Sequence, residues 1–159
     1  MRQRFKCYRQ LESSDCGLTC IRMISKYHSL NIPINRLKDM TKMTRIGISG
    51  SDIMLVLTQL RMEAFAVKIS PGYCLEMPLP AILHWEQSHF VVLYKVDKKK
   101  GKFYVADPAR GKIAYNEEEF NSYWVSPGEE KGIAIVTIRI RIFLLWIRPH
   151  LHWMQIMSG

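Results

Sequence analysis

Residues 10–20 read Q-L-E-S-S-D-C-G-L-T-C and place a cysteine, Cys16, where an apolar-periodic stretch begins. Apolar side chains recur with helical spacing after it, so the sequence predicts a helix over residues 16–27. Asp15 precedes this helix as its expected N-cap. Because the positive end of a helix dipole favours thiolate, Cys16 is a candidate nucleophile.

Three further residues supply what a thiol nucleophile needs. His89, in S-H-F-V-V-L-Y, is a candidate base, and Asp107, in V-A-D-P-A-R-G, is a candidate orienting group. The side-chain amide of Gln10 can reach over the helix start, beside the backbone amide of Cys16, as an oxyanion donor. His84 is an alternative base, although the sequence motif favours His89.

The chain has 159 residues, 48% of them hydrophobic, which suits one folded domain. Its basic start lacks the apolar core of a secretory signal, so we expect a cytosolic protein with four free thiols. A zinc site joining Cys16 and Cys20 to His28 or His84 is disfavoured, because the sequence has no C-x-x-C or H-x-x-x-H pair. We therefore expect no metal and no cofactor.

The net charge is +9, which suits an anionic membrane surface, an acidic ligand or a nucleic acid. The basic residues are scattered along the sequence, and no stripe interleaves them with aromatic residues. No nucleic-acid-binding signature is present either, so no nucleic acid partner is expected. Attraction to an anionic membrane face is the favoured interpretation of the charge.

The periodicity changes from helical to alternating after about residue 60. Two more helices are expected, one opened by Pro33 and one capped by Ser51 or Asp52 and ending near Leu60. Strands, and one short helix capped by Asn116, follow. The strands are expected over residues 64–69, 81–85, 89–96, 103–106, 111–115 and 133–138. Helices followed by an antiparallel sheet predict an α+β fold, with a cleft between a helical and a sheet lobe.

The last 21 residues differ from the rest, because arginines flank a short apolar run, residues 142–147. That run is too short to span a membrane. It could lie on a membrane surface, with Trp146 and Trp153 at the interface, or be a disordered or cut end. The predicted division is therefore a domain over residues 1–138 and a basic, apolar tail over residues 139–159.

Several motifs occur together in an order that resembles one family. They are Q-L-E-S-S-D-C-G-L-T-C, I-S-K-Y-H-S-L, L-P-A-I-L-H-W, H-F-V-V-L-Y and D-P-A-R-G, followed by E-E-E-F-N-S-Y-W and K-G-I-A-I-V. This pattern resembles the C39 family of papain-like cysteine peptidases, the N-terminal domains of bacterial ABC transporters that process and export bacteriocins. The resemblance covers roughly residues 3–137.

The resemblance implies a papain-like fold and a cysteine endopeptidase that removes double-glycine leader peptides at the cytosolic face of the bacterial inner membrane. By analogy Cys16 attacks the carbonyl of the second glycine, and His89 protonates the leaving amine. Asp107 holds the imidazole, and Gln10 with the Cys16 backbone N–H binds the oxyanion. The implied partners are the leader peptide and the membrane and nucleotide-binding domains of an ABC transporter.

Two alternatives remain at this stage. The same fold could dock leader peptides without cutting them, or the tail could make the chain a basic membrane-surface adaptor. The sequence also departs from the family's transporters, since it has no phosphate-binding G-x-x-x-x-G-K-[ST] motif and no spanning helix. We expect a fragment, a truncated product or a stand-alone peptidase.

Overall fold

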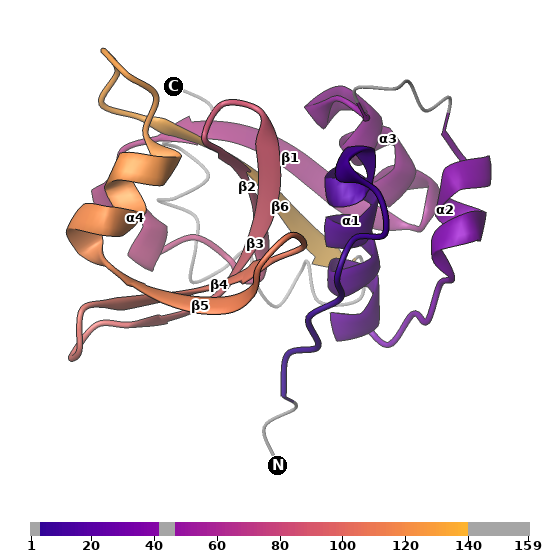
Figure 1. Ribbon diagram of the computed structural model, residues 1–159, viewed down its shortest axis with the longest axis horizontal. Coiled ribbons are helices and arrows are strands. Elements are labelled where there is room, and N and C mark those ends of the chain that lie inside the picture. The colour runs from indigo at the N-terminus through magenta and orange to yellow at the C-terminus, as the bar shows by residue number, and fades with distance from the viewer. Residues whose placement is uncertain (1–3, 42–46, 140–159) are drawn as a thin grey trace.

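The computed structural model describes residues 4–41 and 47–139 and confirms the predicted α+β class (Figure 1). The helices are α1 (Cys16–Tyr27), α2 (Ile34–Asp39), α3 (Gly50–Gln59) and α4 (Glu117–Trp124), with short 3-10 helices at Ser13–Asp15 and Pro71–Leu75. The strands are β1 (Met62–Ile69), β2 (Ala81–Trp85), β3 (His89–Asp97), β4 (Lys102–Asp107), β5 (Gly111–Asn116) and β6 (Gly132–Arg139). Each predicted strand is present, and its ends lie within two residues of the prediction.

The six strands form one antiparallel sheet in the order β1-β6-β2-β3-β4-β5. The strand that comes last in the sequence, β6, therefore lies between β1 and β2, and pairs with both. The hairpins β2–β3, β3–β4 and β4–β5 complete the sheet. Because β3 and β4 are antiparallel neighbours, the start of β3 lies beside the end of β4.

Both faces of the sheet are covered, and each has its own core. Helices α1 and α3 pack on one face, and α4 packs on the other (Figure 1). Successive residues of a strand point to opposite faces, so Val92 packs under the helices while Val91 packs toward α4. This explains why the central strands are apolar at almost every position.

Helix α1 has the predicted bounds, but Asp15 does not cap it as expected. Asp15 occupies the N-cap position, yet its side chain accepts no hydrogen bond from the first turn of α1. Its buried carboxylate accepts the backbone N–H of Glu12, at 3.3 Å, and pairs with Lys38 Nζ of α2, at 3.3 Å. Asp15 therefore ties the helix start to a neighbouring helix.

The predicted cap of α3 is wrong by two or three positions. Ser49 is the N-cap: its hydroxyl accepts from Asp52 N–H, and the Asp52 carboxylate accepts from Ser49 N–H. Asp52 is thus the reciprocal partner in a capping box rather than the cap itself. The predicted Asn116 cap of α4 is confirmed, with Glu119 as its partner.

Of the predicted tail, only Arg139 is described, as the last residue of β6; residues 140–159 lie outside the described residues. The division into a domain and a tail stays a prediction. Within residues 4–41 and 47–139, no helix combines the length and apolarity needed to cross a membrane.

Gly132, at the start of β6, lies against the buried Trp124 ring. A Cβ at this position would overlap Trp124 Cε2, and the indole is fixed by a 3.0 Å hydrogen bond to the Ile133 carbonyl. We expect Gly132→Ala to lower the free energy of unfolding by about 1–3 kcal/mol, because the overlap forces a shift in a packed core. Urea unfolding followed by tryptophan fluorescence measures the change.

Gly72→Ala is the matched control. A Cβ added to Gly72 would meet no heavy atom within 4 Å, and the residue has no positive φ. Its change in unfolding free energy is therefore expected to stay within about 1 kcal/mol. Equal destabilisation by both substitutions would contradict the packing described for Trp124.

Candidate active site

The candidate site lies where the start of α1 meets the sheet. Cys16 is the first residue of α1 and is partly exposed, whereas Cys20, one turn later, is fully buried. His89 is the first residue of β3, and Asp107 is the last residue of β4. The antiparallel pairing of β3 and β4 brings these two strand ends together.

Asp107 holds the imidazole of His89. Asp107 Oδ1 lies 2.7 Å from His89 Nε2 and also accepts the Ala109 backbone N–H at 2.8 Å. The Asp107 side chain is 3% exposed, so the pair is shielded from solvent. Burial acts to raise the pKa of Asp107, but the His89 and Ala109 hydrogen bonds outweigh it and hold that pKa below its ordinary value.

The thiol of Cys16 interacts with the other side of the same imidazole. Because Nε2 is bonded to Asp107, Nδ1 is the ring nitrogen left for the sulfur. Burial acts to raise the pKa of Cys16, but hydrogen bonds with His89 and with the backbone at Phe90 and Gly17 lower it below 9.0. The structure thus brings Cys16, His89 and Asp107 into one connected chain, as the sequence predicted.

His89 is charged over the neutral pH range. Burial acts to lower its pKa, but the hydrogen bonds with Asp107 and Cys16 raise it to about 9. A cation beside a thiol of lowered pKa is the arrangement of a thiolate–imidazolium pair. The arrangement can therefore supply both a nucleophile and a proton donor at neutral pH.

Gln10 lies close to the site through its backbone. Its N–H donates to the carbonyl of Pro108, at 2.9 Å, directly after Asp107 in the sequence. The Gln10 side-chain oxygen is buried without a hydrogen-bond partner among the described residues. No described contact joins its amide to Cys16, so the oxyanion role of Gln10 stays a prediction.

Arg9 is a residue that the sequence analysis missed. Its guanidinium donates to the carbonyl of Ala109 at 2.5 Å, and the N–H of Ala109 donates to Asp107. Arg9 and Gln10 together therefore fasten residues 108–109, the turn that positions the Asp107 carboxylate. No sequence signal points to this contact, because Arg9 stands among other basic residues and its partner is a backbone carbonyl 100 positions away.

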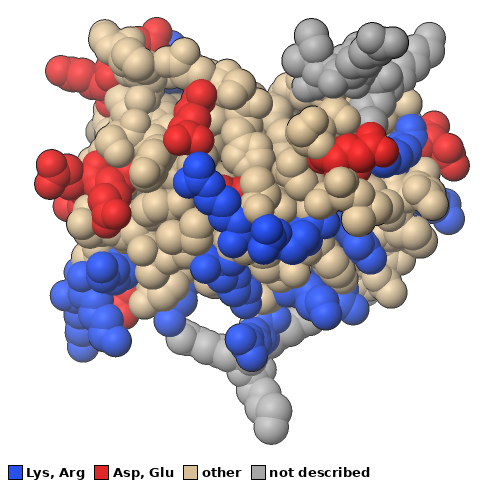
Figure 2. Space-filling model, in the orientation of Figure 1, with Lys and Arg blue, Asp and Glu red and all other residues tan. Residues whose placement is uncertain are grey.

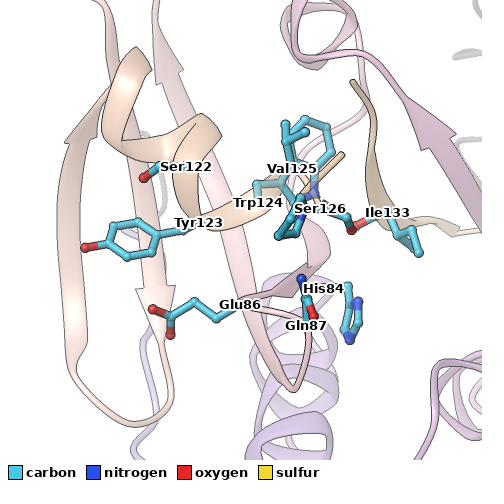
Figure 3. Close-up of a pocket in the computed structure, with 10 residues that line it drawn as sticks. His84, Glu86, Gln87, Ser122, Tyr123, Trp124, Val125, Ser126 and Ile133 are labelled. Carbon is cyan, nitrogen blue, oxygen red and sulfur yellow. Dashed lines mark hydrogen bonds between the residues drawn. The ribbon is translucent and has the colours of Figure 1, made fainter. Parts of the chain in front are cut away.

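His84, the alternative base, points elsewhere. It lines a cavity of about 150 Å³ beside the β2–β3 turn, together with Glu86, Gln87 and residues at the end of α4 and directly after it (Figure 3). Its ring lies 5.4 Å from the ring of Phe90. The turn is fixed by the Glu86 N–H, which donates to the Tyr123 carbonyl at 2.9 Å. Helix α4 therefore supports the turn that leads into His89.

The zinc alternative gains no support from the geometry. Cys7, Cys20 and Cys74 are free thiols, and burial raises the pKa of Cys74 to about 12. Across the described ranges, no group of three or more His, Cys, Asp or Glu side chains is arranged to hold a metal ion. A neutral, buried thiol is a poor metal ligand and a poor nucleophile.

The sequence profile of the Peptidase C39 family matches residues 4–127. The chain belongs to the Peptidase C39 family. Members of this family are cysteine peptidases, so the partly exposed thiol of Cys16 lies in a cysteine-peptidase fold.

Curated relatives of this C39 chain are longer proteins. The chain is 33% identical, over 147 residues, to the probable microcin-H47 secretion/processing ATP-binding protein MchF of Escherichia coli. It is 36% identical, over 121 residues, to the lactococcin-G-processing and transport ATP-binding protein LagD of Lactococcus lactis subsp. lactis. These alignments cover 89% and 72% of this chain but only 21% and 17% of the relatives, so the chain spans about a fifth of their length.

Solved structures share the fold of this C39 chain. A double glycine motif protease from an AMS/PCAT transporter, in complex with the leader peptide, has a TM-score of 0.75 at 24% identity, covering 86% of this chain and 94% of that one. The peptidase domain of Streptococcus ComA has a TM-score of 0.74 at 20% identity, with coverages of 86% and 99%. At these identities the likeness confirms the fold alone, a papain-like α+β arrangement.

The thiolate–imidazolium pair predicts how Cys16 reacts with an alkylating agent. We expect His89→Ala to raise the apparent pKa of Cys16 to 9.0 or above, because burial still disfavours the thiolate while the contact with His89 is lost. Iodoacetamide labelling, quantified at Cys16 by mass spectrometry across pH, measures this. At pH 7 the labelling rate should fall about tenfold or more.

His84→Ala is the control, since its ring lies on the same hairpin but makes no described contact with the thiol. Its labelling profile should match that of the unsubstituted chain. A profile that shifts in His84→Ala and not in His89→Ala would contradict the pairing of Cys16 with His89.

Proposed function

We propose that this C39 chain is an endopeptidase that removes double-glycine-type leader peptides, with Cys16 as nucleophile, His89 as proton carrier and Asp107 as orienting group. One observation carries the proposal: the bonded chain from Asp107 through His89 to a partly exposed thiol at the start of a helix. A thiol that only filled the core would have its pKa raised by burial, as that of Cys20 is.

The chemistry follows from the two pKa directions. The Cys16 thiolate attacks the carbonyl carbon of the scissile peptide bond and forms a tetrahedral oxyanion. The His89 imidazolium then gives a proton to the leaving amine, and a thioester remains on Cys16. The neutral imidazole next takes a proton from water as the water oxygen attacks the thioester carbonyl carbon. The C–S bond then breaks, the acid product leaves, and the thiolate–imidazolium pair is restored. Throughout both steps, Asp107 stays bonded to His89 Nε2 and so keeps Nδ1 directed toward the sulfur.

The oxyanion requires donors beside the sulfur. The backbone N–H of Cys16 lies at the α1 N-terminus, where the first amides of a helix have no intrahelical partner. We propose the side-chain amide of Gln10 as the second donor. The contacts of residues 9 and 10 with the 108–109 turn support this, because they hold the Gln10 backbone near Asp107.

The names of the relatives support the substrate and partners that we propose. The relatives' names describe processing together with secretion or transport, and one solved neighbour is a double glycine motif protease bound to the leader peptide. We propose that the leader of a peptide precursor is cut after its second glycine, in a cleft too narrow for larger side chains. The surrounding assembly would be the membrane and nucleotide-binding domains of an ABC transporter, at the cytosolic face of the membrane.

Cleavage of a synthetic precursor tests this function. The probe is a leader peptide that ends in Gly-Gly followed by ten residues of cargo, with products identified by mass spectrometry. We expect a cut after the second glycine, and a loss of about 10⁴-fold or more in kcat/KM for Cys16→Ala, because the covalent route is removed. Cys7→Ser, which changes a half-buried thiol outside the bonded chain, should retain activity within a few-fold.

Other outcomes of this experiment would be decisive. Unchanged cleavage by Cys16→Ala would overturn the assignment of the nucleophile. Binding of the leader without any cleavage by the unsubstituted chain would show a docking module instead of a peptidase.

The proposed narrow cleft has a separate test in the substrate. Replacement of the second glycine of the leader by valine should lower kcat/KM at least a hundredfold, and equal cleavage of the two peptides would contradict a narrow cleft.

The oxyanion role of Gln10 has its own test. We expect Gln10→Ala to lower kcat by about 10²–10³-fold with KM changed only a few-fold, because the donor acts on the transition state. Gln10→Glu, of nearly equal size but with a carboxylate as acceptor, should be at least as slow. Activity of Gln10→Ala within threefold of the unsubstituted chain would rule out the side-chain donor.

A further inference from the structure

Basic side chains that are scattered in the sequence are gathered by the fold. They surround three tyrosines where the segment before α1 crosses α1, β3, β4 and β5. We call them the basic face: Arg4, Lys6, Arg9, Arg22, Lys95 and Lys112. Figure 2 shows a band of Lys and Arg across the lower middle of the molecule, with Asp and Glu above the band and at its two sides.

Two of these cations lie over the ring of Tyr8. The Arg22 guanidinium lies 3.9 Å from the centre of its ring, and Lys6 Nζ lies 5.8 Å from it. Attraction to the face of an aromatic ring holds a cation without neutralising it. The expectation that basic and aromatic residues do not interleave is therefore wrong: residues 4–9 read R-F-K-C-Y-R, and the fold adds Arg22 to the same ring.

Two more tyrosines extend the cluster across the sheet. Lys112 Nζ lies 5.3 Å from the ring centre of Tyr94, and Lys95 Nζ lies 5.0 Å from that of Tyr104. Phe5 stacks on Tyr94 with ring centres 4.8 Å apart, which fixes the N-terminal segment on the sheet. The charged groups thus come from four separate segments held in one place.

Within the described part of the chain, no acidic side chain forms an ion pair with the basic face. The lysine ion pairs among the described residues are Lys38 with Asp15 and Lys68 with Glu129, and no cation of the basic face takes part in one. Uncompensated like charges repel each other, so a cluster of this kind favours an anionic partner.

The composition of the basic face favours lipid headgroups over a protein or a nucleic acid. Stable protein interfaces have an apolar centre depleted of charge, whereas the residues that define this face are all cations and the tyrosines beneath them are covered by those cations. Nucleic acids stack their bases on open aromatic rings, but cations lie over the rings of Tyr8, Tyr94 and Tyr104. Lipid headgroups require only density of positive charge.

We propose that the basic face binds the anionic headgroups of a phospholipid bilayer. This inference rests on the proposed function, which puts the chain beside a membrane transporter. Arg22 lies six residues along α1 from Cys16, about 9 Å at the helical rise per residue. The basic face therefore extends from Arg22 to Arg9, which supports the turn after Asp107, so a bilayer on this face lies beside the candidate active site.

Vesicle flotation of the whole chain tests the inference. The probes are vesicles of phosphatidylcholine alone and of phosphatidylcholine with one quarter phosphatidylglycerol. We expect binding to the anionic vesicles only, weakened as salt screens the charges. Each Lys or Arg near an anionic surface contributes roughly fivefold to partitioning. The double variant Lys6→Glu/Lys112→Glu should therefore bind at least tenfold more weakly.

Arg36→Glu/Lys131→Glu is the matched control, with the same change in net charge at exposed residues outside the basic face. It should lose less than threefold in binding. Equal losses in the two double variants, or no preference for anionic vesicles, would overturn the inference. So would a Lys6→Glu/Lys112→Glu variant that keeps vesicle binding but loses leader affinity, which would identify an acidic peptide as the partner.

The peptidase assay separates this inference from the proposed function. Both double variants should cleave the soluble precursor peptide as the unsubstituted chain does, because none of the four residues belongs to the candidate active site. Cleavage without vesicle binding would remove only the lipid proposal. Vesicle binding without cleavage by the unsubstituted chain would remove only the peptidase proposal.

Discussion

The contact between the start of α1 and the first residue of β3 is the interaction on which the site depends. Cys16 and His89 come from opposite sides of the junction between helices and sheet, and Asp107 fixes the imidazole between them. Folding places the thiol so that a proton passes from sulfur to nitrogen. The raised pKa of His89 alone would make stability fall as pH rises from about 6.5 through 9, whereas the lowered pKa of Cys16 acts in the opposite direction.

The surroundings of this contact are organised to keep it rigid. The apolar core between α1 and the sheet fixes the helix, the Asp15–Lys38 pair fastens its start, and the 108–109 turn is held by Arg9 and Gln10. Buried polar groups that lack partners are costly, and among the described residues the Gln10 side-chain oxygen and one oxygen of Asp15 are two of them. Both residues precede the nucleophile within a short stretch of sequence, residues 10–16.

Much of the fold and site was accessible from the sequence because the signals are local. The spacing of apolar residues predicted α1 and α4 with their observed bounds, and alternation predicted the strands. The motifs around Cys16, His89 and Asp107 indicated groups that the structure brings together.

The features that the sequence did not predict depend on residues that are distant in the chain. The insertion of β6 between β1 and β2, the bond from Arg9 to Ala109 and the basic face all require the tertiary fold. The cap of α3 failed for a local reason, since Ser49, Ser51 and Asp52 are all good caps and Gly50 occupies the first helical position.

The most direct test of the bonded chain is the titration of His89 itself. In the whole chain with labelled imidazole, NMR chemical shifts of His89 across pH 5–11 report its protonation. We expect a pKa of about 9, and a lower value when Cys16→Ala removes the thiolate. A His89 that titrates near 6.5 in both proteins, as a histidine without these partners does, would show that the thiol, imidazole and carboxylate are not bonded as described.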